Sequence, residues 1–574
     1  PPALLLLAGL DAVTATRLTL ALVYALGGLG AFRLLLGWFG LLPALAGAVL
    51  YQLFPYRLYD LFVRGALPEF AAFLWLPWIV YFTAQILGRN DAEGGGWLRP
   101  FQRIESPFDG LKAAAKATFS RDSIARSGLR SATRRPFLPA TFAWTALILT
   151  HNLTAFMAAV GLMISWPLVS LAQRDASPDR YPARLLRSGL QLAPPLVLAG
   201  LLSAWYVLPA IREAGWVALG ATGASHGYAN HFATFGALFD WSWRFPYPDA
   251  AAPTVPLPGY VLIALLLAAA LAWATARRRQ PARISPVILV LGAITAVAVW
   301  LTTAASAVVW ELLAPLLSNL QFPWRWQTLV GLGAAGLAAA SLSLLPVPRR
   351  WRQGIALTAL AGVAVYGLAG LPVARQTPPP PEVTVEAMWA FDREMGQVGA
   401  TWTGEFLPRA VTEPRWSIGR EPSEPAVMAA PPAATLQVQP RQSGYLDRVY
   451  AARTDAPAQL RFQLFYFPAW TVWLDGARVP TTAAGPLGLL SVDLPPGEHV
   501  ITLRWGATAA VWLGRVLAGL AWLLVLGLML LGVPHRRLAV AGWLIVGGLG
   551  LLSITGASAD VVSPTAVDAD FGPV

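Results

Sequence analysis

The chain contains no cysteine and few charged residues of either sign. Of its 574 residues, 13% are charged, whereas ordinary soluble domains carry about 25%. The absence of cysteine excludes disulfides, thiolate metal sites and cysteine nucleophiles. Hydrophobic residues make up 56% of the chain, which excludes a disordered protein. Because so much apolar surface cannot be hidden in a water-soluble core, the sequence predicts a polytopic α-helical membrane protein.

Two signature motifs of soluble enzymes are missing as well. The sequence has no P-loop Gly-x-x-x-x-Gly-Lys and no His-Glu-x-x-His, which argues against P-loop ATPases and helical zinc proteases. The net charge is +12, but the basic stretch 111–135 has no recognition-helix pattern beside it. We therefore expect this stretch to lie on anionic lipid and expect no nucleic-acid partner.

Long apolar stretches predict about twelve transmembrane helices. The run 138–172 is interrupted by His151 and Asn152, so we expect two helices that meet at this polar tip. Arginine-rich loops stay in the cytoplasm, and five such loops (89–135, 173–188, 277–283, 349–352 and 536–537) give one consistent orientation. The remaining apolar stretches lie near 16–36, 39–56, 67–88, 190–210, 258–276, 285–304, 326–345, 354–371, 511–533 and 538–556.

One large soluble insert interrupts the hydrophobic chain at 372–510. Strand patterns at 459–467, 470–474, 488–494 and 498–505 are separated by turn sequences, which is typical of a small β-sandwich. The part before about residue 440 is proline-rich and poorly patterned. We therefore expect a transmembrane helical domain at 1–371, an extracytoplasmic β-rich domain at 372–510, and two further transmembrane helices with a tail at 511–574.

Polar residues concentrate at the outer ends of the expected helices, where ionisable groups are costly and so are functional candidates. Arginine binds phosphate with two parallel hydrogen bonds, and a carboxylate or histidine can accept a proton from a hydroxyl. The structural alternative stays open for single residues, since Asp60 and Arg64, four apart, can simply pair. We expect no metal ligands. The catalytic candidates are Glu69, His151 and Glu213, and the substrate-binding candidates are Tyr56, Asp60, Arg64, Asn152, Arg212, Gln321, Trp324 and Arg325.

Three motifs occur in the order Tyr51–Glu69, His151-Asn152 and Gln321-Phe-Pro-Trp-Arg325. Together they resemble a bacterial integral membrane family labelled "6-pyruvoyl-tetrahydropterin synthase-related". That family is similar to the GT-C superfamily of membrane glycosyltransferases, which use polyprenyl-phosphate sugars. The stretch Phe465–Gly476, followed by Leu494–His499, resembles the β module of the YfhO-like membrane proteins.

The resemblance implies a GT-C-like, multi-pass protein of the bacterial inner membrane. Its activity would be of the hexosyltransferase type, moving a sugar from a polyprenyl-phosphate carrier to a cell-envelope acceptor outside the membrane. Arg64, Arg212 and Arg325 would bind the carrier phosphate. In that superfamily the catalytic carboxylate lies in the first outer loop, which we expect to lie upstream of this fragment. No cofactor is implied with certainty, and a divalent metal is left open. The alternative is a non-catalytic relative that acts in envelope assembly or in transport of lipid-linked saccharides.

Overall fold

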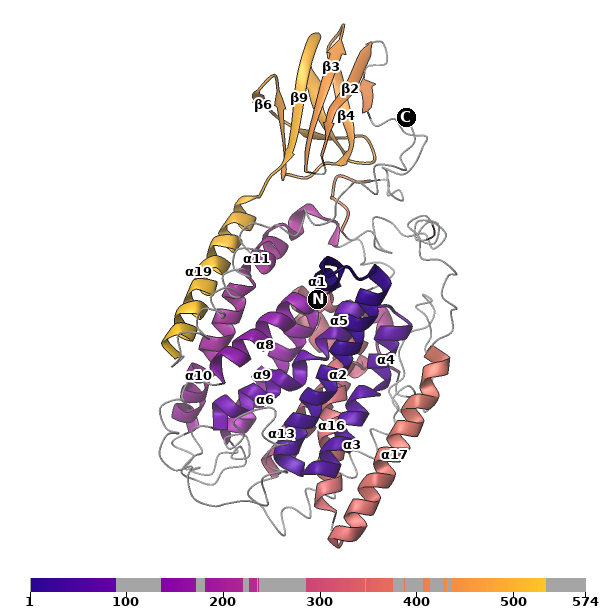
Figure 1. Ribbon diagram of the computed structural model, residues 1–574, viewed down its shortest axis with the longest axis vertical. Coiled ribbons are helices and arrows are strands. Elements are labelled where there is room, and N and C mark those ends of the chain that lie inside the picture. Colours follow the sequence, from indigo (N-terminus) through magenta and orange to yellow (C-terminus); the bar gives the residue numbers. More distant parts are fainter. Residues whose placement is uncertain are drawn as a thin grey trace. The chain divides into compact units, whose positions relative to one another are not determined.

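The structure is a computed structural model, drawn in Figure 1. The described residues fall into two compact units, one formed by residues up to 200 together with 225–378, the other by 201–224 together with residues after 378. The described ranges are 2–88, 136–171, 181–219, 227–234, 236, 285–345, 347–374, 387, 406–412, 427–430, 435–444 and 446–532.

The first unit is a bundle of helices. Its core combines aliphatic and aromatic side chains from α2, α3, α6, α8, α9, α13 and α16. The helices are α1 (Pro2–Leu7), α2 (Ala12–Phe39), α3 (Leu41–Gln52), α4 (Pro55–Phe62), α5 (Leu67–Ala72), α6 (Trp75–Gly88), α8 (Phe137–Thr150), α9 (Asn152–Leu171), α10 (Tyr181–Leu202), α13 (Ser285–Leu301), α14 (Ala307–Leu312), α15 (Ala314–Leu317), α16 (Gln327–Leu344) and α17 (Arg349–Ala374).

Seven helical segments among the described residues are long and apolar enough to cross a membrane. Two more apolar helices, α8 and Val287–Leu301 within α13, are shorter. The prediction of a multi-pass helical membrane protein is confirmed to that extent. The predicted spans 258–276 and 538–556 lie outside the described residues, so they stay predictions.

Three of the predicted helices are broken. The stretch 190–210 divides at Ser203 into α10 and α11 (Ala204–Arg212), and another break lies beside the polar site. The stretch 39–56 was expected to be one helix, but α3 ends at Gln52 and α4 begins at Pro55. Proline suits the first turn of a helix, where its missing N–H needs no partner, so Pro55 favours the start of a new helix. The stretch 67–88 likewise divides into α5 and α6. The expected break at His151, between α8 and α9, is confirmed.

Small residues allow the helices of the bundle to approach closely. A Cβ placed on Gly47 of α3 would lie 2.6 Å from the carbonyl oxygen of Ala335 on α16. Gly336 of α16 faces Leu291 of α13 in the same way, at 2.6 Å from its Cδ1. Close packing through small residues is the usual means of holding helices together in lipid.

The second unit contains a β-sandwich. Leu460 and Leu490 of one sheet and Ile501 and Leu503 of the other share one buried core, as expected for two packed sheets. One sheet has the order β1-β4-β8-β7 and the other β2-β3-β9-β5-β6. The strands are β1 (Val427–Ala430), β2 (Leu436–Ser443), β3 (Asp447–Thr454), β4 (Ala458–Phe465), β5 (Trp470–Leu474), β6 (Ala477–Val479), β7 (Thr482–Ala484), β8 (Leu489–Leu494) and β9 (Gly497–Trp505).

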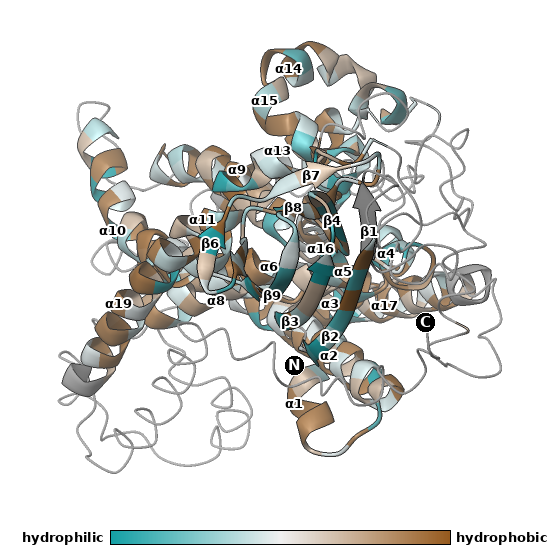
Figure 2. Cartoon of the chain, turned by 90° about the horizontal axis from the view of Figure 1, so that it is seen from above, coloured by the Kyte–Doolittle hydropathy of each residue, from teal (hydrophilic) through white to brown (hydrophobic). Residues whose placement is uncertain are grey.

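Two helices of the second unit pack against each other. Helix α11 (Ala204–Arg212) lies antiparallel to α19 (Ala509–Gly532), and a Cβ on Gly514 would lie 2.5 Å from the carbonyl oxygen of Ala204. At the other end of the pair, Thr508 donates a hydrogen bond to Glu213. Figure 2 shows α19 largely in the brown of hydrophobic residues, whereas β2 and β9 carry teal hydrophilic positions. A membrane-spanning helix thus follows directly from a water-facing sheet.

Candidate functional site

The site begins in the short helix α4 and the turn that follows it. Tyr56 and Asp60 lie four residues apart, so they share one buried face of α4. Gly65 has a φ of +61°, a backbone conformation that residues with a Cβ rarely adopt. This turn reverses the chain so that Glu69, in the first turn of α5, comes back onto Arg64.

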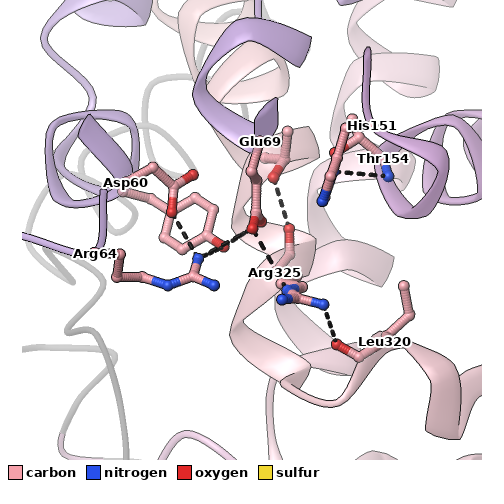
Figure 3. Close-up of polar contacts among 9 residues, drawn as sticks. Asp60, Arg64, Glu69, His151, Thr154, Leu320 and Arg325 are labelled. Atoms are coloured by element: carbon pink, nitrogen blue, oxygen red, sulfur yellow. Dashed lines mark hydrogen bonds and ion pairs between the residues drawn. The ribbon is translucent and has the colours of Figure 1, made fainter. Parts of the chain in front are cut away.

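Glu69 is the centre of a polar cluster, shown in Figure 3. Its Oε1 accepts a hydrogen bond from the hydroxyl of Tyr56. Its Oε2 lies 3.0 Å from Nη1 of Arg64 and 3.5 Å from Nε of Arg325. The same Nη1 of Arg64 donates to Oδ1 of Asp60 at 2.7 Å. Both oxygens of Glu69 are therefore already engaged, one by a hydroxyl and the other by two guanidinium groups.

The cluster is buried and electrically balanced. Asp60 is fully buried and Glu69 is 1% exposed, while the side chain of Arg64 is 13% exposed. Two arginines and two carboxylates bring the formal charge of the group to zero. Buried charges are tolerated when they are paired and hydrogen-bonded in this way.

Arg325 reaches the cluster from a part of the sequence far from Glu69. It lies in the 3-10 turn η10 (Pro323–Trp326) that leads into α16. Its Nη1 donates to the carbonyl oxygen of Leu320 at 2.9 Å, which fixes the side chain while its Nε faces Glu69. A direct ion pair thus joins the Tyr51–Glu69 motif to the Gln321–Arg325 motif.

An aromatic group supports the two arginines. Phe322 and Trp324 stack with centroids 4.4 Å apart and planes at 4°. The guanidinium of Arg325 lies 5.2 Å from the Phe322 ring, and that of Arg64 lies 6.0 Å from it, within cation–π range. The ring of His231 meets Trp324 edge-on at 5.0 Å. Trp324 is consequently only 5% exposed.

His151 caps the start of α9. Its backbone is extended, with φ −156° and ψ 101°, and the backbone N–H of Thr154 donates to Nδ1 at 3.3 Å, as at an N-cap. Because Nδ1 accepts this hydrogen bond, a neutral ring carries its proton on Nε2. In Figure 3 the ring of His151 lies beside Glu69 and Arg325.

Among the described residues, the hydrogen bonds and ion pairs of this cluster do not involve the predicted residues Asn152, Gln321, Arg212 and Glu213. Asn152 is exposed at the first position of α9, and Gln321 is half-buried with a φ of +61°. Arg212 and Glu213 belong to the second unit, where Arg212 is exposed and Glu213 accepts from Thr508. The structure therefore brings together Tyr56, Asp60, Arg64, Glu69 and Arg325, with His151 beside them.

Sequence reasoning missed Arg57. It is fully buried, and its guanidinium lies 4.6 Å from the Tyr24 ring and 5.1 Å from the Phe70 ring. Its Nη1 donates to Gln52, while its Nε and Nη2 have no hydrogen-bond partner among the described residues. An arginine within the aromatic stretch Tyr51–Phe62 was the available signal, because a charge at membrane depth needs a partner.

An apolar cavity of about 130 Å³ lies between the same helices. It is lined mainly by aliphatic side chains, including Leu34 of α2, Leu76 of α6, Val169 of α9 and Leu329 of α16. Leu329 is one helical turn beyond Arg325. The bundle therefore offers an apolar space within a turn of the polar cluster on α16.

The cluster is chemically suited to bind an anion. The hydrogen bonds of Arg64 all use Nη1, and those of Arg325 leave its Nη2 unused within the described chain. Together with Nε2 of His151, these groups are N–H donors for oxyanion oxygens. Among the described residues, no group of three or more His, Cys, Asp or Glu could hold a metal ion.

Comparison with known proteins adds no relative. No protein-family model, no curated protein and no solved structure matches this chain.

Proposed function

We propose that this protein is a membrane glycosyltransferase with a GT-C-like helical domain. It takes a sugar from a polyprenyl-phosphate carrier and transfers it to a cell-envelope acceptor on the extracytoplasmic side of a bacterial inner membrane. One observation carries the proposal: Arg64 and Arg325 converge on Glu69 and still have guanidinium edges unused in the described chain. Such edges suit the phosphate of a lipid-linked donor.

The neighbouring features support an amphiphilic donor. The carrier's phosphate would bind Arg64 and Arg325. The N–H at Nε2 of His151 would donate a third hydrogen bond to the same phosphate. The apolar cavity of about 130 Å³ near Leu329 would hold the first part of the carrier's hydrocarbon chain, since it is too small for a whole polyprenyl chain. A ligand with a charged head and an apolar chain therefore matches both parts of the bundle.

In the transfer step, the acceptor hydroxyl oxygen attacks the anomeric carbon of the sugar. The bond from that carbon to the phosphate oxygen breaks, and the polyprenyl phosphate leaves with the bonding electron pair. Arg64 and Arg325 stabilise the charge that develops on the leaving phosphate. Because both oxygens of Glu69 are engaged, Glu69 orients the arginines, and the proton of the acceptor hydroxyl is released to water on the extracytoplasmic side.

A second candidate is a non-catalytic relative that binds the lipid-linked saccharide for envelope assembly or transport. The full engagement of Glu69 favours it, because a carboxylate held by two arginines and a tyrosine is a weak proton acceptor. In this case the site would bind the donor without turnover. Both candidates bind the lipid-linked donor, but only the glycosyltransferase transfers its sugar.

Transfer of radiolabelled sugar from polyprenyl-phosphate donors by the full-length protein tests the proposal. Arg325→Gln is expected to lower donor binding at least about tenfold, because a hydrogen-bonded charge contact is worth roughly 1.5–3 kcal/mol. Arg441→Gln, on strand β2, is the matched control and should bind the donor normally. Binding without transfer would select the non-catalytic candidate, and failure of the wild type to bind any donor would reject both.

A further inference from the structure

A cluster of aromatic rings lies where the β-sandwich meets its helices. Phe467 stacks on Trp505 with centroids 5.5 Å apart, and Trp470 meets Trp505 edge-on at 5.3 Å. Trp216 meets Phe467 edge-on at 5.3 Å. We call these four residues the aromatic foot of the β domain.

The foot is placed at the end of a membrane-spanning helix. Trp505 is the last residue of β9, and α19 begins at Ala509. Trp216 follows the end of α11, which packs along α19. Since α19 is one of the helices able to cross a bilayer, its first turn marks the level of the membrane surface. The foot therefore lies within about one helical turn of that level.

Two rings of the foot are only partly covered by protein, whereas Trp470 is buried. Trp216 is 36% exposed and Trp505 is 41% exposed. The adjoining segment 406–409 is held by a hydrogen bond from Ala218 N–H to the Leu407 carbonyl, and Phe406 beside it is 61% exposed. Tryptophan rings that are apolar at one edge and polar at the other favour the boundary between lipid headgroups and acyl chains.

Two arginines flank the exposed rings. Arg212 ends α11, and the backbone of Arg409 donates to the Trp216 carbonyl at 3.0 Å. Both residues are exposed. Basic side chains at this level attract the phosphates of anionic lipids. The far end of the sandwich is different, because its β5–β6 turn is the polar pair Asp475-Gly476.

We propose that the aromatic foot, with Phe406, Arg212 and Arg409, is a phospholipid-binding surface inserted into the headgroup layer of the bilayer around α19. The occupant is the membrane interface itself, since only residues 506–508 separate Trp505 from α19, whose first residues include the exposed Trp512 and Leu513. The aromatic foot of the β domain would then contact the lipid headgroups, while the β5–β6 turn points into the aqueous phase. This inference does not depend on sugar transfer.

The absence of native cysteine gives a direct test. A nitroxide label is attached to Phe406→Cys of the full-length protein in vesicles of phosphatidylethanolamine and phosphatidylglycerol, with Ala477→Cys, exposed on β6, as the control. Collision rates with oxygen, which enters lipid, and with a water-soluble nickel chelate report the depth of each label. The label at 406 is expected to favour oxygen severalfold over the nickel chelate, and the label at 477 should show the reverse.

Two results would overturn the proposal. Equal exposure of both labels to the nickel chelate would place the foot in water, and low collision rates with both reagents at 406 would indicate a protein contact instead. Should Phe406→Cys fold poorly, Arg409→Cys reports from the same segment and is judged by the same criteria.

Discussion

Glu69 shows how one residue organises the polar cluster. It is the only carboxylate within the described chain that contacts both Arg64 and Arg325, so its removal leaves two buried guanidinium groups with Asp60 alone. Losing one partner of a buried pair is much more costly than losing the whole pair, because the remaining charge stays desolvated. The role of Glu69 is therefore first to make two arginines compatible with the apolar bundle.

We predict that Glu69→Gln destabilises the protein by about 3–5 kcal/mol, the usual cost of breaking a buried ion pair. Glutamine keeps the size of the side chain, so the effect reports the charge. The measurement is the midpoint of unfolding in lipid nanodiscs, with intrinsic tryptophan fluorescence as the probe of unfolding.

The matched control is Glu498→Gln in the β domain. Its partner Arg453 is 3.4 Å away, and the two side chains are 71% and 78% exposed, so the loss should be below about 1 kcal/mol. Equal losses for the two substitutions would show that the Glu69 cluster is as weakly coupled as a surface pair.

At the scale of secondary-structure elements, close contacts between helices depend on glycine. Helices α3 and α16 approach so closely at Gly47 that an added methyl group would meet the backbone oxygen of Ala335. Backbone atoms cannot turn aside as a flexible side chain can. The contact between these helices also holds α16 and therefore the turn η10 that carries Arg325.

We predict that Gly47→Ala costs about 1–3 kcal/mol, the usual penalty for overpacking. Gly362→Ala in α17 is the control, because nothing lies within 4 Å of its added Cβ, and alanine should gain up to about 1 kcal/mol from helix propensity. Both are measured as unfolding midpoints. A neutral Gly47→Ala would mean that α3 and α16 can separate without loss.

The turn between β5 and β6 makes a pH-dependent contact with strand β9. Nδ1 of His499 and Oδ2 of Asp475 are 2.7 Å apart. The hydrogen bond to His499 lowers the pKa of Asp475 below its usual 3.8. The same hydrogen bond raises the pKa of His499 above its usual 6.5. The ionised Asp475 stabilises the folded domain above pH 3.8, and this contribution is lost as the pH falls through its lowered pKa. The protonated His499 stabilises the folded domain below pH 6.5, and this contribution is lost as the pH rises through its raised pKa.

We therefore predict that this pair stabilises the β domain most between about pH 4 and 6.5. The unfolding midpoint of the full-length protein, compared with that of His499→Gln across pH 3–9, measures the effect. The difference between the two proteins should be largest inside this window and should shrink on both sides. A constant difference would show that the contact does not titrate.

For the whole molecule, the sequence predicted local features better than distant pairings. Alternating residues and turn sequences located β5 at 470–474 and placed β4, β8 and β9 within one or two residues. The polar pair at 151–152 correctly predicted the break between α8 and α9. Strands β1, β2 and β3 were missed, because they lie in or just after a proline-rich region with weak alternation. Strands β6 and β7 were missed because each has only 3 residues.

The sequence predicted which residues form the site, but it did not predict the contacts between distant segments. Tyr56, Asp60, Arg64 and Glu69 are neighbours in sequence, so their clustering follows from local structure. Their contact with Arg325 depends on how α16 packs against the earlier helices, which periodicity does not encode. Arg57 was missed for a similar reason, since its aromatic partners come from α2 and α5.

The passage from β9 into α19 has a mechanical consequence. β9 pairs with β3 from Gly497 to Arg504 and with β5 on its other side, and only residues 506–508 separate it from α19. A pull on the helix is thus applied along the central strand of the five-stranded sheet. Because the ladder hydrogen bonds lie across the strands, that force loads both ladders in shear, so that many bonds must break together before the domain yields.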